Sequence, residues 1–265
     1  MKKLHLNAEL RRAETKWYIL IMTTNNAPNN APDNSSDNSS GATLPPRQLR
    51  TLESPDEHAF AAVDRYRSDI ALLNYLLQDL RVLVRRYAKG ELELSEHQKI
   101  VWEVHGLQRR TVVCDPKRLL DDTSMQFVGF FGDRRERVDE VVLNANEQAL
   151  LDEFVNYPGI LSYSSCELVN GYWANLVVHS EPDDREAWRG SQIHKDAVAT
   201  VAPAAYHNVR IHNGLIAAGV MGSDTVVIGS TKYWDYDTDP VWHAVRRLPG
   251  GQSESMVGPV GDGDQ

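Results

Sequence analysis

The stretch that decides the predicted fold is Ile160 to Ser180, ILSYSSCELVNGYWANLVVHS. Two strand-like runs flank Asn170-Gly171, and an Asn-Gly pair between such runs is a strong signal for a two-residue β-hairpin turn. Because loop length sets the register, this turn predicts that Leu168 pairs with Trp173 and that Ser162 pairs with His179. One predicted face carries Trp173, Asn175, Val177, His179, Ser162, Ser164 and Cys166, and the other carries Tyr172, Ala174, Leu176, Val178, Leu161, Tyr163, Ser165 and Glu167.

The second of these faces is the more apolar one. A sheet of this kind packs helices on its apolar face, so we expect helices to cover that side. The face with Trp173, Asn175 and His179 is then left to meet water, a ligand or another subunit. Candidate functional residues are therefore sought on this open face.

The composition narrows the class of protein. The formal net charge is −9 and 42% of the residues are hydrophobic, which argues against a nucleic-acid partner and against a surface that seeks anionic lipid. Cys114 and Cys166 lie far apart, so neither a disulfide framework nor a structural zinc site is indicated. The apolar run Trp17 to Met22 is too short to span a membrane. A cytoplasmic protein is the expectation.

Both ends of the chain have the composition of disordered tails. Residues 23–46 repeat Asn, Pro, Ser and Asp with little to bury, and such segments cannot offset the entropy cost of ordering. We therefore expect disordered tails at residues 1–46 and 250–265. The residues before Met22 differ in character from those that follow, which favours Met22 over Met1 as the native start.

The segment 47–110 is expected to be a helical hairpin. Apolar residues recur at helical spacing from about His58 to Lys89, and Gly90 follows as a C-terminal cap. A second helix is expected from Ser95 to about His105. The pair would serve as a cap or a dimerisation arm in front of the next domain.

Residues 111–240 are expected to form an α+β domain with the ferredoxin-like βαββαβ order. Its expected elements are a strand at Met125–Phe131, a helix at Asn144–Tyr157, the hairpin, a helix at Glu181–Val201 that Pro203 ends, and a strand at Ala204–Gly214. An additional strand is expected at Asp224–Trp234.

This order, the short hairpin and the segment WRGSQIHKDAV (Trp188–Val198) resemble the dimeric α/β-barrel superfamily, in particular its antibiotic-biosynthesis and heme-degrading monooxygenases. The resemblance covers roughly residues 125–234. It implies a homodimeric barrel in which the strand Asp224–Trp234 reaches the partner, and it implies monooxygenase chemistry. Trp188 matches the helix tryptophan of the heme-degrading members.

The rest of the heme-degrading triad is not matched. Phe127 or Gly129 stands where the family has an Asn, and Val198 stands where it has the His that ligates iron. His194 lies one turn earlier and is the first candidate ligand if heme is bound. As a lone His on an apolar helix stripe, His194 is alternatively a structural residue, and Trp188 is a packing residue first.

Side-chain alternation extends the open face to the strand Ala204–Gly214. Arg210 would orient an anionic or phenolic ligand there, and His179 or His212 would transfer protons near neutral pH. His207 falls on the opposite face as a core histidine. Alternatively, the polar residues satisfy one another across a subunit interface. The predicted open-face set is Trp173, Asn175, His179, Tyr206, Asn208, Arg210 and His212.

The leading functional hypothesis is a monooxygenase-like oxidoreductase that acts on a small aromatic or polycyclic molecule, without a permanent cofactor. A second hypothesis is a heme-binding protein or heme enzyme, and a third is a non-catalytic ligand-binding or assembly module. The candidate catalytic residues are His179, His212 and Arg210. The candidate ligand-binding residues are Trp173, Asn175, Tyr206, Asn208, Trp188 and His194.

Overall fold

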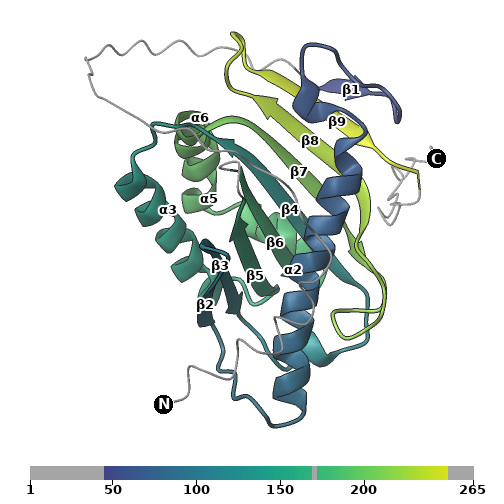
Figure 1. Cartoon of the computed structure of the whole chain (residues 1–265), viewed down its shortest axis with the longest axis vertical. Coiled ribbons are helices and arrows are strands. Elements are labelled where there is room, and N and C mark those ends of the chain that lie inside the picture. The colour runs from purple at the N-terminus through teal and green to yellow at the C-terminus, as the bar shows by residue number, and fades with distance from the viewer. Residues whose placement is uncertain (1–44, 169–171, 250–265) are drawn as a thin grey trace, which may run out of the picture. The chain divides into compact units, whose positions relative to one another are not determined.

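One mixed sheet of nine strands runs through the part of the chain that this computed structural model describes, residues 45–168 and 172–249 (Figure 1). Its strand order is β1-β9-β8-β7-β4-β6-β5-β3-β2; β1 pairs with β9 in parallel, and the other pairs are antiparallel. The strands are β1 Arg47–Leu49, β2 Gln98–Val104, β3 Leu107–Val113, β4 Met125–Arg134, β5 Ile160–Glu167, β6 Tyr172–His179, β7 Tyr206–Ile216, β8 Val227–Asp235 and β9 Trp242–Arg247.

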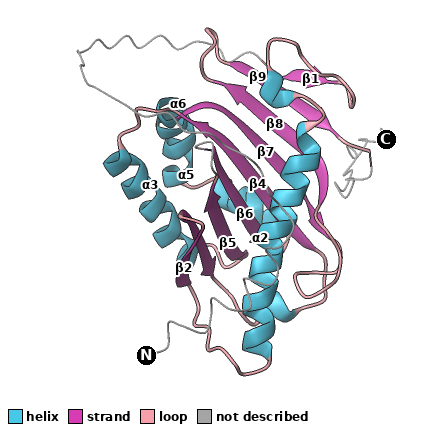
Figure 2. Ribbon diagram, viewed as in Figure 1, coloured by secondary structure: helices cyan, strands magenta, loops and turns pink. Residues whose placement is uncertain are grey.

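Helices cover both faces of this sheet (Figure 2). They are α2 Arg65–Ala88, α3 Glu140–Glu153, α4 Pro182–Arg189, α5 Gln192–Asp196, the π-helical turn η4 Ala197–Val201 and α6 Ala202–Ala205, with 3-10 turns η1 Ala59–Ala61, η2 Arg118–Leu120 and η3 Phe154–Asn156. No helix among the described residues has both the length and the apolar character needed to cross a membrane.

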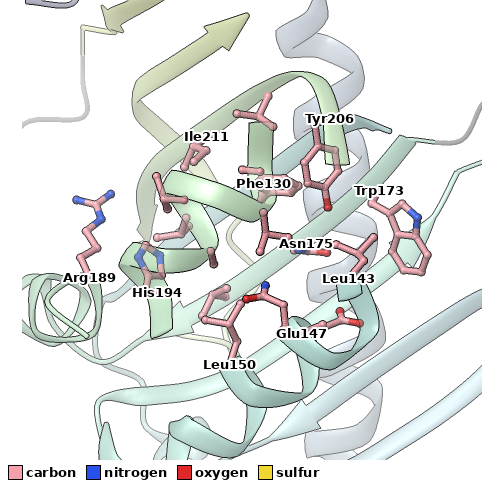
Figure 3. Close-up of a pocket in the computed structure, with 18 of the residues that line it drawn as sticks. Phe130, Leu143, Glu147, Leu150, Trp173, Asn175, Arg189, His194, Tyr206 and Ile211 are labelled. Carbon is pink, nitrogen blue, oxygen red and sulfur yellow. The ribbon is translucent and has the colours of Figure 1, made fainter. Parts of the chain in front are cut away.

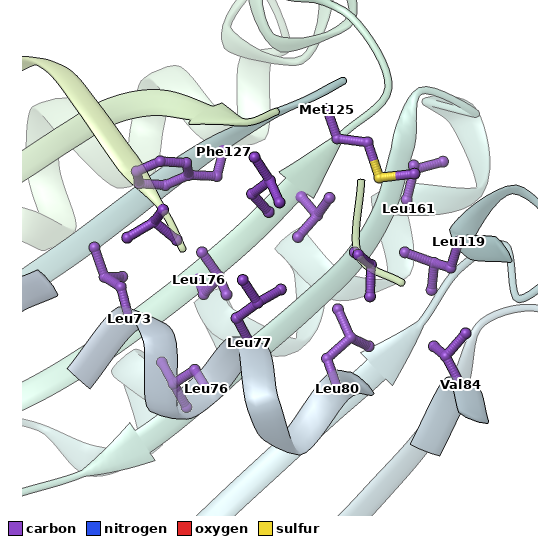
Figure 4. Packing of buried hydrophobic residues seen from close by; sticks show 14 of the residues in the cluster. Leu73, Leu76, Leu77, Leu80, Val84, Leu119, Met125, Phe127, Leu161 and Leu176 are labelled. Carbon is purple, nitrogen blue, oxygen red and sulfur yellow. The ribbon is translucent and has the colours of Figure 1, made fainter. Parts of the chain in front are cut away.

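The long helix α2 packs its apolar stripe against one face of the sheet, the face that carries Ala174 and Leu176. Leu73, Leu77 and Leu80 are completely buried there (Figure 4). Their spacing places them on one side of the helix. Gly129 on β4 allows the close approach, because a Cβ at that position would lie 2.8 Å from a methyl carbon of Leu73. This interface is the larger part of the core.

The opposite face of the sheet carries Asn175 and Val177, and it is called the second face from here on. It is covered by α3 and α4. Leu151, Phe154 and Trp188 pack there against Val177 of β6. Val177 follows Leu176, which lies in the cluster under α2, and successive strand residues point to opposite faces. The helices of the predicted βαββαβ unit therefore cover the face that was expected to be open, which carries Asn175 and Val177. The apolar face, which those helices were expected to cover, is covered by α2.

The pairing of β5 with β6 differs from the predicted register by one residue. Ser165 pairs with Asn175, and Glu167 pairs with Trp173. The Leu168 amide donates a hydrogen bond of 2.8 Å to the Tyr172 carbonyl, so the connection contains residues 169–171. The expected turn residues Asn170-Gly171 lie outside the described residues.

A one-residue shift exchanges the two faces of a strand, and this has a direct consequence for β5. Tyr163 and Ser165 lie on the Asn175 face, whereas Cys166 lies in the core under α2. Burial raises the pKa of the Cys166 thiol to about 12. The expected position of Cys166 on the open face is wrong.

The helix expected from Ser95 to His105 is wrong, because this segment contains strand β2. Its residues alternate between half-buried and exposed, which is the period of a strand. His105 and Gly106, with φ of 52° and 81°, form the turn to β3. Positive φ at both central residues is the geometry that joins two strands through a two-residue loop.

The expected ferredoxin-like barrel preceded by a helical hairpin is therefore wrong as a fold. The strand and helix order expected after Met125 is present, and β7, β4, β6 and β5 are adjacent. These four strands are the middle of the nine-stranded sheet. β3 and β2 extend it beyond β5, and β8, β9 and β1 extend it beyond β7.

Leu77 tests the packing of α2. Replacement of this completely buried side chain with Ala is expected to lower the free energy of unfolding by about 2 to 5 kcal/mol, through lost burial and the cavity left behind. Urea unfolding measures the change. Leu52→Ala is the control, since Leu52 is 82% exposed and its truncation is expected to change stability little. Equal effects would contradict the α2 interface.

Candidate functional site

A pocket of about 650 Å³ lies between the second face of the sheet and helices α3 to α6 (Figure 3). Its floor is formed by β4, β6, β7 and β8, which contribute Phe130, Asn175, Ile211 and Lys232. Most of the lining is apolar or aromatic. A concave, mainly apolar pocket with a few polar groups has the general form of a small-molecule site.

Helix α3 forms one wall. Asp139 begins it, because its carboxylate accepts hydrogen bonds from the amides of Val141 and Val142 at 3.0 and 3.2 Å, a typical N-cap. Leu143, Glu147 and Leu150 then follow at helical spacing and line the pocket. The wall is therefore one face of α3.

The break between α4 and α5 positions a second wall. α4 ends at Gly190, and the Ser191 hydroxyl accepts a hydrogen bond of 2.9 Å from the His194 amide to begin α5. The same hydroxyl donates to the Glu153 carboxylate at 2.9 Å. Ser191 thus fixes the start of α5 to the end of α3, with His194 in the pocket wall.

The segment from α5 through η4 covers the pocket without being packed into the core. No residue of α5 or η4 is buried, although Ala197, Val198 and Val201 are apolar and line the pocket. π-helical turns such as η4 occur frequently at functional sites. The apolar side of this segment faces the pocket instead of packed side chains.

Aromatic rings are placed at both ends of the pocket. His194 contacts Trp188 edge to face with 4.6 Å between centroids, and Trp188 contacts Phe154 at 5.5 Å. At the other end, Phe130 and Tyr206 are 5.3 Å apart. Such edge-to-face pairs hold rings in defined orientations.

Apart from Nη2 of Arg134, which forms an ion pair with Glu140, two polar atoms in this lining have no hydrogen-bond partner among the described residues. They are Oδ1 of Asn175 and Nε1 of Trp188, and both are buried. A buried polar atom without a partner costs free energy. Both atoms are buried from solvent, so a bound molecule would reach them only after a change of side-chain rotamer.

Glu147 belongs to a polar cluster on the α3 side of the pocket. It accepts hydrogen bonds from Arg110 and from the Tyr163 hydroxyl, the latter at 3.1 Å. Burial raises the pKa of Tyr163, and the Glu147 charge raises it further. Tyr163 is therefore a neutral hydrogen-bond donor, and the Glu147 charge is already paired.

The predicted site residues separate into two groups. Trp173, Asn175, Tyr206, Trp188 and His194 all line the pocket. The predicted catalytic residues do not line it. Arg210 and His212 lie on the opposite face of the sheet, under α2, and His179 is buried beside Trp188.

Arg210 and His212 form a buried network with Asp69 of α2. Arg210 donates to Asp69 through Nε at 2.5 Å and Nη2 at 2.7 Å, and Nε2 of His212 lies 2.9 Å from the same carboxylate. Burial opposes the Asp69 charge, but these hydrogen bonds hold the pKa of Asp69 below its usual value. The network joins α2 to β7.

The other nitrogen of His212 is also used. Nδ1 lies 2.8 Å from the Thr231 hydroxyl, which accepts from Tyr66 at 2.6 Å. Burial lowers the pKa of His212, so it is neutral. Asp69 can only accept, so Nε2 carries the proton and Nδ1 accepts from Thr231. Thr231, His212 and Asp69 are at most 2% exposed, and their network joins α2 to β7 and β8.

Asn208 and His207 also lie in other places than strand alternation predicted. Asn208 donates to Asp133 at 3.3 Å and does not line the pocket. A register shift at Asp133/Arg134 separates Tyr206 from Asn208. His207 is not a core histidine, because its side chain is 39% exposed and pairs with Asp237 at 2.7 Å.

The pocket also contains residues that the sequence reasoning did not select. Glu147 and Leu150 have the helical spacing of a shared face, which was a usable signal in the sequence. Lys232 and Arg189 gave no such signal, because only the folded sheet brings β8 next to α4. Among the described residues no group of three or more His, Cys, Asp or Glu could hold a metal ion.

Comparison with known proteins gives no family. No family model matches the chain, and no curated protein matches it. A solved protein from Shewanella oneidensis is similar at 13% identity and a TM-score of 0.30, covering 37% of this chain and 96% of its own. A protein of unknown function from Nitrosomonas europaea is similar at 12% identity and a TM-score of 0.32, covering 37% and 94%. Likenesses this weak carry no argument about fold or function.

Asp69 tests the structural role of the buried network. Asp69→Ala leaves Arg210 charged and buried without its partner, and loss of one member of a buried ion pair costs about 3 to 5 kcal/mol. Urea unfolding measures this loss. Asp237→Ala is the control: Asp237 is 50% exposed in its pair with His207, so about 0 to 1 kcal/mol is expected. Similar losses in both variants would contradict the assignment.

His179 predicts a pH dependence of stability. It is completely buried, neither ring nitrogen has a partner among the described residues, and burial lowers its pKa from 6.5 to about 4. The unfolded chain takes up this proton as pH falls through 6.5, but the folded chain does so only near 4. Its contribution to stability is therefore complete above pH 6.5 and is lost progressively down to about 4.

Urea unfolding at about pH 7.5 and about pH 5 measures this effect. The unmodified protein should lose about 2 kcal/mol more between the two values than His179→Leu does. His105→Asn is the control, since His105 is exposed and its φ of 52° suits Asn. A pH dependence that persists in His179→Leu would show that another group causes it.

Proposed function

We propose that this protein binds a small, largely apolar molecule, with aromatic character, in the pocket between the sheet and α3 to α6. The observation that carries the proposal is the unpacked cover: α5 and η4 present apolar residues to the pocket, yet none of their residues is buried. Protein interiors are normally packed at the density of organic crystals. A bound molecule would supply the contacts that the described residues do not make.

The polar atoms of the lining support a molecule with a few hydrogen-bonding groups. After a change of rotamer, the unpartnered Asn175 Oδ1 would accept from it and the unpartnered Trp188 Nε1 would donate to it. In an apolar pocket, a small number of polar groups mainly fixes the orientation of the ligand. The apolar area supplies most of the affinity.

Heme is a second candidate occupant, because His194 lines the pocket as an imidazole whose pKa burial lowers. A neutral imidazole is the form that ligates iron. Binding of hemin would shift and sharpen its Soret band, and His194→Ala should lose this change. A Soret band that the unmodified protein leaves unchanged would rule heme out.

Two expectations from the resemblance stay predictions. A monooxygenase-like reaction on the bound molecule would consume dioxygen, which an oxygen electrode measures with an aromatic substrate. The homodimer was expected from the resemblance and from the open polar face, together with the strand Asp224–Trp234, which a lone unit would leave as an exposed edge. Helices cover both faces in the described part of the chain, so the open face no longer supports a homodimer.

Binding is tested with N-phenyl-1-naphthylamine, an uncharged aromatic dye whose fluorescence rises in apolar surroundings. We expect saturable binding. Ile211→Trp fills the pocket from its floor and should weaken dye binding about ten-fold or more, a loss of about 1.4 kcal/mol. Fluorescence titration measures both affinities.

Val101→Trp is the matched control, because it adds the same indole to a strand position that is 57% exposed. Dye affinity should be unchanged in this variant, and both variants should keep cooperative urea unfolding. A dye that does not bind saturably, or that binds Ile211→Trp as well as the unmodified protein, would overturn the proposed function.

A further inference from the structure

One end of the pocket is basic. Arg185 and Arg189 of α4 line it, with side chains that are 16% and 26% exposed, and Lys232 reaches it from β8. Figure 3 shows Arg189 and His194 at one end and Trp173 and Tyr206 at the other. The basic end therefore lies away from the Trp173 end.

The two arginines share one carboxylate. Glu186 accepts from Arg185 Nε at 3.1 Å and from Arg189 Nη1 at 2.7 Å. Arg189 also donates through Nη2 to the amide oxygen of Asn213 at 2.9 Å, which holds its guanidinium against β7. One negative charge between two positive charges leaves a surplus of positive charge.

Lys232 adds to this surplus. It pairs with Ile211 across the sheet and so shares the pocket face. Burial lowers its pKa, and the charge of Arg189 lowers it further. Within the described part of the chain, no carboxylate lies within the 4 Å of an ion pair from Lys232.

The charged residues of the pocket lining are mainly positive, whereas the net charge of the chain is negative. The chain has a formal net charge of −9, whereas the lining contains five Arg or Lys residues and one carboxylate, Glu147. Glu147 is paired with Arg110 and Tyr163. Arg134 pairs with Glu140, and Arg185 and Arg189 share Glu186. The surplus positive charge therefore lies at Lys232 and the arginine pair, and this end of the pocket favours an anion.

We propose, on the basis of the binding function above, that the ligand is an apolar molecule with a carboxylate, which docks between Lys232, Arg189 and Arg185 while its apolar part lies along the pocket. Arginine presents a planar fork that matches a carboxylate. Lysine contributes a point charge. The half-buried position of these groups strengthens the interaction relative to an exposed pair.

The test uses displacement of N-phenyl-1-naphthylamine by a matched pair, 2-naphthoate and 2-naphthalenemethanol. They share the aromatic body, and only the first carries a charge. In the unmodified protein naphthoate should bind about ten-fold more tightly, as expected for a charged hydrogen bond in a partly buried site. Added salt should weaken naphthoate binding and leave the alcohol unaffected.

Lys232→Met keeps an apolar side chain of similar length and removes the charge. It should reduce the preference for naphthoate to about three-fold or less and leave the affinity for the alcohol unchanged. Arg189→Gln is a second variant, useful if Lys232→Met does not fold, and should act in the same direction. Lys99→Met is the control, because Lys99 is an exposed strand lysine outside the lining.

The outcomes separate the two proposals. If the neutral dye does not bind, the proposed binding function fails. If the dye binds but the alcohol displaces it as well as naphthoate does, the pocket stands and the carboxylate proposal is overturned. A naphthoate preference that is unchanged in both Lys232→Met and Arg189→Gln also overturns it.

Discussion

Alternation of side chains along the central strands is the constraint on which the rest of the structure depends. Apart from its irregularities, each of β6 and β7 points successive side chains to opposite faces of the sheet, one under α2 and the other under α3 to α6. Leu176 and Arg210 face α2, whereas Asn175 and Ile211 face the pocket. Because helices cover both faces, the elements that cover each face decide whether a side chain acts in packing or in binding.

The α2 face shows how residues of catalytic type become structural. Asp69, His212 and Thr231 have contacts that would suit a proton relay, but each is at most 2% exposed and Arg210 neutralises the carboxylate. A satisfied buried network specifies one arrangement of the elements it joins. Here it fixes the position of α2 along β7 and β8, within a core that is otherwise apolar.

The pocket face is the reverse case. A hydrogen bond from Ser191 to Glu153 anchors its cover, α5 and η4, to the end of α3. The cover leaves space where a protein core would normally be filled with side chains. The net positive charge at one end sets a direction within that space. An apolar body with an acidic end matches both features.

The sequence alone determined the elements with strong local periodicity. These include the stripe of α2, the helix at α3, the strands β7 and β8, and the alternation that places Trp173 with Asn175. It also determined the order of elements after Met125. These features follow from spacing within one segment, which the chain fixes locally.

Only the tertiary structure decided which residues of neighbouring strands lie on the same face of the sheet. The pairing of β5 with β6 is shifted by one position from the predicted register, and the irregularity at Asp133/Arg134 separated Tyr206 from Arg210. Strand alternation has a period of two residues, so one added residue moves a side chain to the other face. The phase between β6 and β7 is set through β4, and pairing between segments distant in sequence leaves no local pattern.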